Sequence, residues 1–192
     1  MGTKLRIALI IALQTLALLS MIAMRQWTLN TGTSVILETL PVDPRSLFSG
    51  DYVRLNYKIS NIRFDEITGD REFKRPDCVY VLLKEGDPYW QPVSIHHKKP
   101  VAPSGHVAIK GDVNYINDIS WNQETQKSEK VRNINIRYGI ESYFVPEGEG
   151  RGLERPGEGE KVTIQVAVDK YGNAGIKSLL VNGKERYRES LF

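Results

Sequence analysis

An uninterrupted apolar segment near the N-terminus places the strongest constraint on how this chain can fold. Residues 7–24 contain no charged side chain, and their polar side chains are limited to Gln14, Thr15 and Ser20. As a helix, this segment reaches about 27 Å, close to the roughly 30 Å hydrocarbon thickness of a bilayer. The segment therefore predicts one transmembrane helix.

The charges on either side of this segment indicate its orientation. Lys4 and Arg6 precede the apolar residues, whereas only Arg25 closely follows them. Because basic residues favour the cytoplasmic side of a membrane, we expect the N-terminus inside and the remainder of the chain outside.

A cleaved signal peptide is the alternative interpretation of the same segment. Signal peptides have a shorter apolar core and small residues at positions −3 and −1 of the cut. A cut after Ala23 would place the bulky Met21 at −3, and no cysteine lies close by for lipid attachment. We therefore expect an uncleaved anchor, with a cytoplasmic stub and transmembrane segment over 1–25 and one exported domain over 26–192.

The charge of the exported part gives no indication of nucleic-acid binding. The chain has 26 basic and 23 acidic residues, and three basic residues are the only charges within positions 1–25. Removing these three leaves 23 basic against 23 acidic residues, so the expected domain is formally neutral. About 165 residues are enough for one domain with a hydrophobic core. The one cysteine, Cys78, cannot form an intramolecular disulfide, and we expect it to be buried in a strand as a small apolar residue.

Residues beyond position 32 follow a two-residue period, which is typical of β-strands. After the turn signal Gly50-Asp51, the side chains at 53, 55, 57 and 59 are apolar or aromatic, while those between them are polar. Residues 134–140 alternate in the same way, with Ile134, Ile136, Tyr138 and Ile140 on one face. The other expected strands are 34–39, 79–84, 90–96, 106–111, 162–168 and 175–181.

Turn signals and polar segments separate these strands. Asn182-Gly183 is a strong signal for a two-residue hairpin turn, because both residues accept positive φ. The polar residues 117–130 are expected to form an exposed hairpin loop, and a short helix is possible over 150–155. The sequence thus predicts a mainly β fold, with a transmembrane helix followed by one antiparallel β-barrel or two-sheet domain.

Three segments give the chain a family resemblance. Residues 50–57 read Gly-Asp-Tyr-Val-Arg-Leu-Asn-Tyr, residues 41–45 read Pro-Val-Asp-Pro-Arg, and residues 138–148 contain Tyr-Gly followed by Phe-Val-Pro-Glu-Gly. With the apolar segment, these resemble the bacterial GDYXXLXY proteins over nearly the whole chain. The resemblance implies a membrane-anchored exported protein of the bacterial cytoplasmic membrane, with a multi-span membrane protein as a possible partner. It implies no established activity, catalytic residue or cofactor.

Polar side chains around two turns form the candidate binding site for a ligand or partner. A carboxylate and a guanidinium can together bind a polar group. The alternative is that both aspartates cap turns, which Asp-Pro and Gly-Asp commonly do, and we favour this structural role. The aromatic candidates could form a ligand wall, although tyrosines on a strand more often belong to the core. The candidate residues are Asp43, Arg45, Gly50, Asp51, Tyr52, Arg54, Tyr57, Tyr143 and Glu147.

Catalysis by a serine–lysine pair is not expected. Aligning Gly50-Asp51 with the corresponding turn of signal peptidases places Val42 where the nucleophilic serine belongs. Valine cannot attack a carbonyl, and nearby Ser46 and Ser49 do not have the required spacing to Lys58.

Metal binding is not expected either. The three histidines are His96, His97 and His106, and neighbouring strand residues point to opposite faces. If residues 100–105 form a loop between paired strands, His97 and His106 could approach each other. Zinc would still need four ligands, and no cluster of Cys or His completes the set. The acidic glycine-rich segments 147–150 and 154–160 do not have the spacing of a calcium-binding EF-hand loop.

The sequence therefore favours a non-enzymatic, single-pass membrane protein whose β domain is an accessory or interaction module. The alternative is an extracytoplasmic domain that binds a small polar ligand, and a serine-dependent hydrolase is a distant third.

Overall fold

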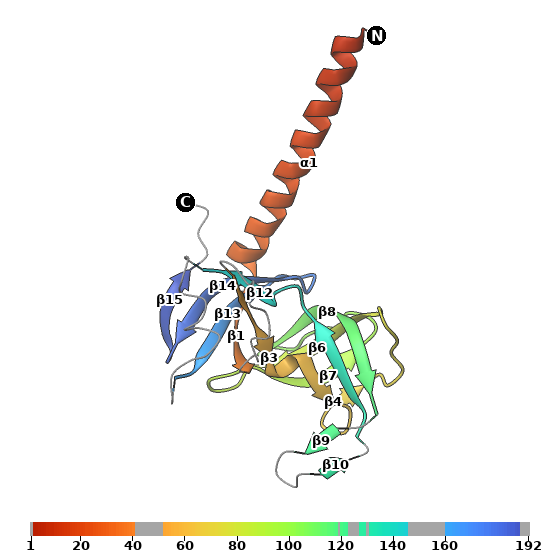
Figure 1. Cartoon of the computed structure of the whole chain (residues 1–192), viewed down its shortest axis with the longest axis vertical. Coiled ribbons are helices and arrows are strands. Elements are labelled where there is room, and N and C mark those ends of the chain that lie inside the picture. Colours follow the sequence, from red (N-terminus) through yellow and green to blue (C-terminus); the bar gives the residue numbers. More distant parts are fainter. Residues whose placement is uncertain are drawn as a thin grey trace.

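A long N-terminal helix stands away from a β domain in the computed structural model. The structure describes residues 2–40, 52–118, 120–122, 127–129, 131–145 and 160–188. Helix α1 (Thr3–Thr31) is continuous, and its N-terminal part projects beyond the domain (Figure 1). Its apolar side chains are exposed over most of its length, and only Thr28 and Leu29 are buried. The expected apolar helix is thus present, and it continues to Thr31, about two turns beyond the apolar segment.

The first sheet has five antiparallel strands in the order β15-β14-β13-β1-β3. Its strands are β1 (Thr33–Leu40), β3 (Asn56–Tyr57), β13 (Val162–Val168), β14 (Ala174–Val181) and β15 (Lys184–Arg188). Asn182 and Gly183 connect β14 to β15 with φ values of 52° and 75°. The hairpin predicted from these two residues is therefore confirmed.

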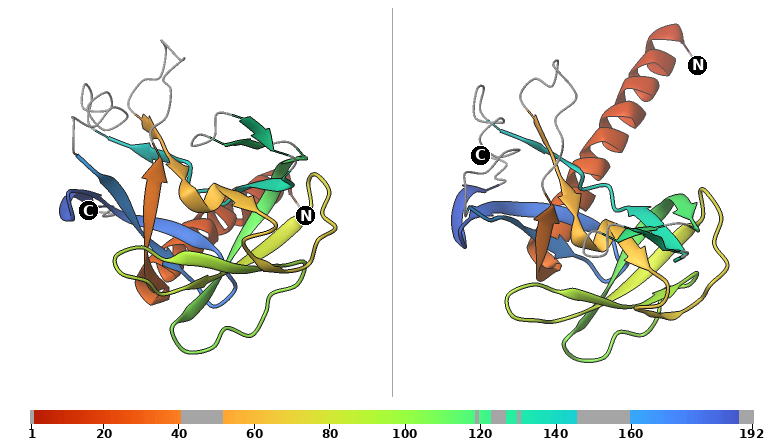
Figure 2. Two further views of the ribbon diagram at one scale, coloured as in Figure 1. Left: turned by 90° about the horizontal axis from the view of Figure 1, so that it is seen from below. Right: turned by 60° about the horizontal axis from the view of Figure 1, so that its bottom comes forward.

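The second sheet has six strands in the order β4-β11-β8-β6-β7-β5. Its strands are β4 (Asn61–Arg63), β5 (Thr68–Gly69), β6 (Cys78–Lys84), β7 (Gln91–His96), β8 (His106–Asn117) and β11 (Asn133–Arg137). Neighbouring strands are antiparallel except for β5 and β7, which are parallel. Two views turned toward the underside show how this sheet lies beside the first one (Figure 2). Buried side chains from both sheets join in one hydrophobic core, so the mainly antiparallel β fold is confirmed.

The alternation over residues 53–59 is present in the burial of these side chains, but the segment is not one strand. It contains β2 (Tyr52–Arg54), β3 and a 3-10 helix η1 (Lys58–Ser60). Strand β2 pairs with β12 (Ser142–Phe144), whereas β3 pairs with β1. The chain therefore changes partner at Leu55, and Val53, Leu55, Tyr57 and Ile59 all remain buried.

The prediction that Cys78 is buried was wrong. Cys78 is the first residue of β6 and its side chain is exposed. The inward-facing positions of this strand are Val79, Val81 and Leu83, so Cys78 falls on the outer face.

The remaining strand predictions need smaller adjustments. Strand β8 continues to Asn117, six residues past the expected end. The polar segment after it contains β9 (Ser120–Asn122) paired with β10 (Lys127–Glu129), which confirms a hairpin there. The possible helix over 150–155 lies outside the described residues.

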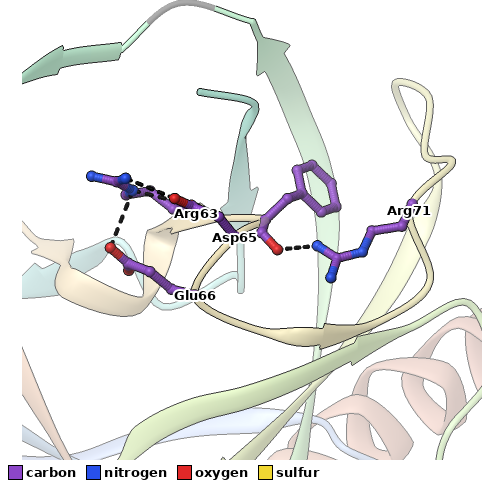
Figure 3. A network of polar contacts seen from close by, with 5 residues as sticks. Arg63, Asp65, Glu66 and Arg71 are labelled. Atoms are coloured by element: carbon purple, nitrogen blue, oxygen red, sulfur yellow. Dashed lines mark hydrogen bonds and ion pairs between the residues drawn. The ribbon is translucent and has the colours of Figure 1, made fainter. Parts of the chain in front are cut away.

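Two arginines make different polar contacts around the segment between β4 and β6 (Figure 3). Arg71 donates to the carbonyl oxygens of Phe64 and Ile67, and its guanidinium lies 5.8 Å from the centre of the Phe64 ring. Arg63 instead pairs with two exposed carboxylates, at 2.8 Å from Asp65 and 3.1 Å from Glu66. Arg71 therefore fixes the backbone, whereas Arg63 forms a surface ion-pair cluster.

We expect Arg71→Ala to lower the free energy of unfolding by about 1–2 kcal/mol, because two charge-assisted hydrogen bonds and a cation–π contact are lost. The matched variant Arg63→Ala should cost less than about 1 kcal/mol, because exposed ion pairs contribute little. Urea unfolding followed by circular dichroism measures both values. A larger loss of unfolding free energy for Arg63→Ala than for Arg71→Ala would contradict the role of Arg71 in fixing the backbone.

Candidate functional site

Residues 52–57 and 138–145, which carry two of the segments behind the family resemblance, interlock in the structure. Their strands β2 and β12 pair in antiparallel register, with Arg54 opposite Ser142 and Val53 opposite Tyr143. At the end of this ladder, the Leu55 amide donates to the Glu141 carbonyl oxygen at 2.9 Å. Two segments that are more than 80 positions apart thus form one unit.

Two buried tyrosine hydroxyls, one from each segment, donate hydrogen bonds that connect the two segments. The Tyr57 hydroxyl donates to the Ile140 carbonyl oxygen at 2.6 Å, and the Tyr138 hydroxyl donates to the Ile59 carbonyl oxygen at 2.7 Å. Burial raises the pKa of both hydroxyls well above the ordinary tyrosine value, and the negative charge of Glu141 raises it further. Both tyrosines therefore remain protonated and act as hydrogen-bond donors.

A second feature is the turn over residues 169–173, which joins β13 to β14 beside the end of α1 (Figure 1). One oxygen of the Asp169 carboxylate accepts from the amides of Tyr171 and Asn173, at 2.8 and 2.9 Å. Its other oxygen accepts from the Thr28 hydroxyl at 2.8 Å and from the Asn173 side-chain amide at 3.0 Å. Asp169 therefore ties the turn to the helix.

These four hydrogen bonds decide the charge state of Asp169. Burial alone would raise the pKa of its carboxyl group. The hydrogen bonds from Asn173, Thr28 and the Tyr171 amide favour the ionised form and outweigh burial, so the pKa lies below its usual value. The junction between helix and domain thus holds a carboxylate.

Close packing completes the junction. The Leu29 side chain lies against Gly175, where an added Cβ atom would come within 2.9 Å of Leu29 Cδ2. The Gly32 amide donates to the Thr28 carbonyl oxygen at 2.9 Å as the helix ends and β1 begins. An added Cβ atom at Gly32 would lie 2.9 Å from the Val168 nitrogen. The last turn of α1 is therefore part of the packed domain.

Two adjoining cavities flank the turn. The first, of about 330 Å³, lies between the end of α1 and the turn. The second, of about 260 Å³, lies where the turn meets β8, and there the Lys110 amide donates to the Gly172 carbonyl oxygen at 2.8 Å. Both cavities are lined by Asn173 and Ala174. The first is also lined by Met24, Arg25, Trp27, Thr28, Asp169 and Tyr171, and the second by Lys110, Gly111, Asp112, Arg137, Tyr138 and Gly139.

Comparison with known protein families gives one match that covers most of the chain. The model of the family described as "GDYXXLXY protein" matches residues 14–179. The chain belongs to the GDYXXLXY family. Neither the curated proteins nor the solved structures contain a match to it. The GDYXXLXY match includes the C-terminal part of α1, both interlocked segments and the turn over 169–173. The features described above therefore lie within the matched residues.

The structure describes four of the nine candidate site residues predicted for this GDYXXLXY protein. Tyr57 and Tyr143 lie in the core, Arg54 is exposed on β2, and the backbone of Tyr52 pairs with Phe144. The remaining five candidates, Asp43, Arg45, Gly50, Asp51 and Glu147, lie outside the described residues. Neither of the two cavities is lined by Tyr57 or Tyr143. A binding role for the nine candidates stays a prediction.

The histidines considered as metal ligands have separate surroundings. Strands β7 and β8 both flank β6 and do not pair with each other, so the strand pairing that would bring His97 near His106 does not occur between these two strands. The His97 ring stacks on Phe73 at 4.2 Å, and His96 Nε2 lies 2.9 Å from the Ser94 hydroxyl. Within the described ranges, no cluster of three or more His, Cys, Asp or Glu side chains is arranged for a metal ion.

Of the residues considered for a serine–lysine hydrolase, the structure describes only Lys58. Lys58 Nζ lies 3.1 Å from a carboxylate oxygen of Glu38. Val42, Ser46 and Ser49 lie outside the described residues, so their spacing argument rests on the sequence.

The helix junction was not predicted from the sequence. Strands were expected on both sides of this turn, at 162–168 and 175–181, but the role of Asp169 as the hydrogen-bond acceptor of the turn was not expected. The sequence did contain a signal for this role. Asp169 lies two residues before Tyr171 and four before Asn173, a spacing at which an aspartate commonly caps a turn. Trp27, two residues after the basic end of the apolar segment, was a signal for a membrane interface.

Proposed function

We propose that this GDYXXLXY protein is a single-pass protein of the bacterial cytoplasmic membrane whose β domain is an extracytoplasmic accessory or interaction module. In this proposal residues 1–25 form the cytoplasmic stub and anchor, and residues 26–192 form the exported domain. The observation that carries it is the exposure of the apolar side chains of α1, such as Leu13 at 69% and Met21 at 68%. A soluble protein rarely exposes an apolar surface of this extent, whereas a bilayer would cover it.

The continuity of α1 supports a retained anchor over a cleaved signal peptide. The helix passes through Ala23, the candidate cleavage position, and continues to Thr31. Its final turn contributes Thr28 and Leu29 to the packing of the domain. The apolar segment is therefore joined to the domain by packed helix, with no extended linker at the candidate cut.

The chain provides its own probe of orientation in Cys78, its one cysteine, which is exposed on β6. In cells whose outer barrier has been permeabilised, a membrane-impermeant maleimide should label the wild type and fail to label Cys78→Ser. Labelling that requires lysis of the cytoplasmic membrane would contradict the proposed orientation.

The proposed interaction surface comprises Asp43, Arg45, Gly50, Asp51 and Tyr52, with the exposed Arg54 beside it. The partner in this proposal is a multi-span membrane protein, and its contact with the turn residues would involve their opposite charges. In-cell crosslinking should give an adduct that Asp43→Arg combined with Arg45→Glu abolishes, while Lys98→Glu leaves it unchanged. An adduct that persists in the folded double variant would rule out this surface.

A small-ligand-binding domain is the second candidate function. It is supported by the two adjoining cavities beside the turn over 169–173, which together combine apolar and charged lining residues. A thermal-shift screen of the full chain in detergent tests it, and a set of polar ligands that leaves the melting temperature unchanged would count against it.

A further inference from the structure

The two cavities together form a groove with an apolar end and a charged end. Met24, Trp27 and Tyr171 line the end beside the helix, where the charged side chains are Arg25 and Asp169. Lys110, Asp112 and Arg137 line the other end, on the outer face of the second sheet. Asn173 and Ala174 line both cavities, so the two ends adjoin at these residues. An amphiphile has this combination of properties.

The apolar end lies at the depth of the lipid headgroups of a bilayer. This placement rests on the proposed function of α1 as a membrane anchor. The charge-free segment ends at Met24, and Arg25 follows it. Polar headgroups extend the bilayer from roughly 30 Å to about 40–45 Å, so the next turn of α1 lies at headgroup depth. Trp27 and Tyr171 are 62% and 61% exposed there, as expected for aromatic side chains at a membrane interface.

The charged end has the groups needed for a zwitterionic headgroup. Arg137 lies directly opposite Asp112 in the β8–β11 ladder, so their side chains share one face. Lys110 precedes Asp112 by two positions on β8 and lies on the same face. In the parts of the chain that the structure describes, these three side chains form no ion pair with one another. Two cations and one carboxylate complement a phosphate next to an ammonium group.

We propose that this groove binds a phosphatidylethanolamine molecule of the surrounding bilayer. Lys110 and Arg137 bind the lipid phosphate, and Asp112 binds the ethanolammonium group. The glycerol and the first part of the acyl chains lie against Met24, Trp27 and Tyr171. The Asp169 carboxylate does not compete for the ammonium group, because its oxygens already accept four hydrogen bonds.

The test uses the full chain purified in detergent and titrated with a short-chain phosphatidylethanolamine, with binding followed by native mass spectrometry. The double variant Lys110→Gln/Arg137→Gln should bind at least about tenfold more weakly, because charge-assisted hydrogen bonds to the phosphate are lost. Asp112→Asn should reduce the preference for phosphatidylethanolamine over phosphatidylglycerol. The control Lys98→Gln/Lys99→Gln removes the same charge from exposed positions that line neither cavity.

Three results would overturn the inference: equal affinity in the wild type and the Lys110/Arg137 variant, an equal loss in the control, or displacement of the lipid by millimolar inorganic phosphate. The last result would assign the charged end to a free phosphate. Membrane partition of the same variants is measured separately. Normal partition with unchanged lipid binding contradicts the groove alone, whereas groove-dependent lipid binding by a chain that does not enter membranes contradicts the anchor alone.

Discussion

Replacing Tyr57 with alanine is expected to lower the free energy of unfolding of the β domain by about 3–5 kcal/mol. The Tyr57 side chain is completely buried and contributes to the core between the two sheets. Its removal leaves a cavity and also leaves the Ile140 carbonyl oxygen without the hydroxyl donor at 2.6 Å. Urea unfolding monitored by circular dichroism gives the change directly.

Two further variants separate the contributions at this position. Tyr57→Phe keeps the ring and removes the hydrogen bond, so it should cost about 1–2 kcal/mol. Lys58→Ala removes only an ion pair to Glu38 in which the lysine side chain is 69% exposed, and its effect should be close to zero. A cost below about 1 kcal/mol for Tyr57→Ala would show that this tyrosine does not hold the interlocked segments together.

Replacing Asp169 with alanine should lower the free energy of unfolding by about 2–4 kcal/mol, because a hydrogen-bonded carboxylate is lost and its donors are left unsatisfied. The donors are the Thr28 hydroxyl, the side-chain amide of Asn173 and the backbone amides of Tyr171 and Asn173. Asp112→Ala removes a carboxylate from an exposed strand position and is the matched control, with an expected change near zero. Similar costs for the two variants would contradict the described junction.

The contribution of Asp169 should also depend on pH in a defined direction. Its pKa in the folded protein lies below the ordinary value of about 4. The carboxylate therefore stabilises the fold fully above that ordinary value, and this contribution is lost as the pH falls through the lowered pKa. The difference in unfolding free energy between the wild type and Asp169→Asn should be largest near neutral pH and should shrink at about pH 3. A difference that grows on acidification would have the wrong sign.

Local sequence patterns predicted the parts of the fold that depend on local geometry. The charge-free segment gave the helix, because a long apolar run has few other stable conformations. The two-residue period placed Ile134, Ile136, Tyr138 and Ile140 in the core, and Asn182-Gly183 gave the last hairpin. Each of these features is determined by neighbouring residues.

The features that escaped prediction depend on distant contacts. At Leu55 the chain stops pairing with β12 and begins to pair with β1. The residues that show this change, Glu141 and the strand β1, are distant from Leu55 in the sequence or approach it only through the fold. The contact between Leu29 and Gly175 joins the helix to β14, although the two residues are far apart in the sequence. No local periodicity of the sequence predicts this contact. Cys78 was misplaced because an isolated small residue at a strand end does not define which face it occupies.

The same limit applies to the candidate site. The polar turn around Gly50 and Asp51 was visible as a motif, whereas the groove beside Asn173 requires β8, β11, the turn and α1 to come together. From the sequence, the signature tyrosine Tyr57 could form part of a ligand wall, although strand tyrosines more often belong to the core. Its complete burial shows that Tyr57 belongs to the core.

The intact mass of the protein recovered from alkaline-extracted membranes distinguishes a retained anchor from a cleaved signal peptide. A retained anchor predicts that the protein stays in the membrane pellet and that its mass includes residues 1–23, since α1 continues unbroken into the β domain. A protein released into the supernatant, with a mass that begins after Ala23, would contradict the account.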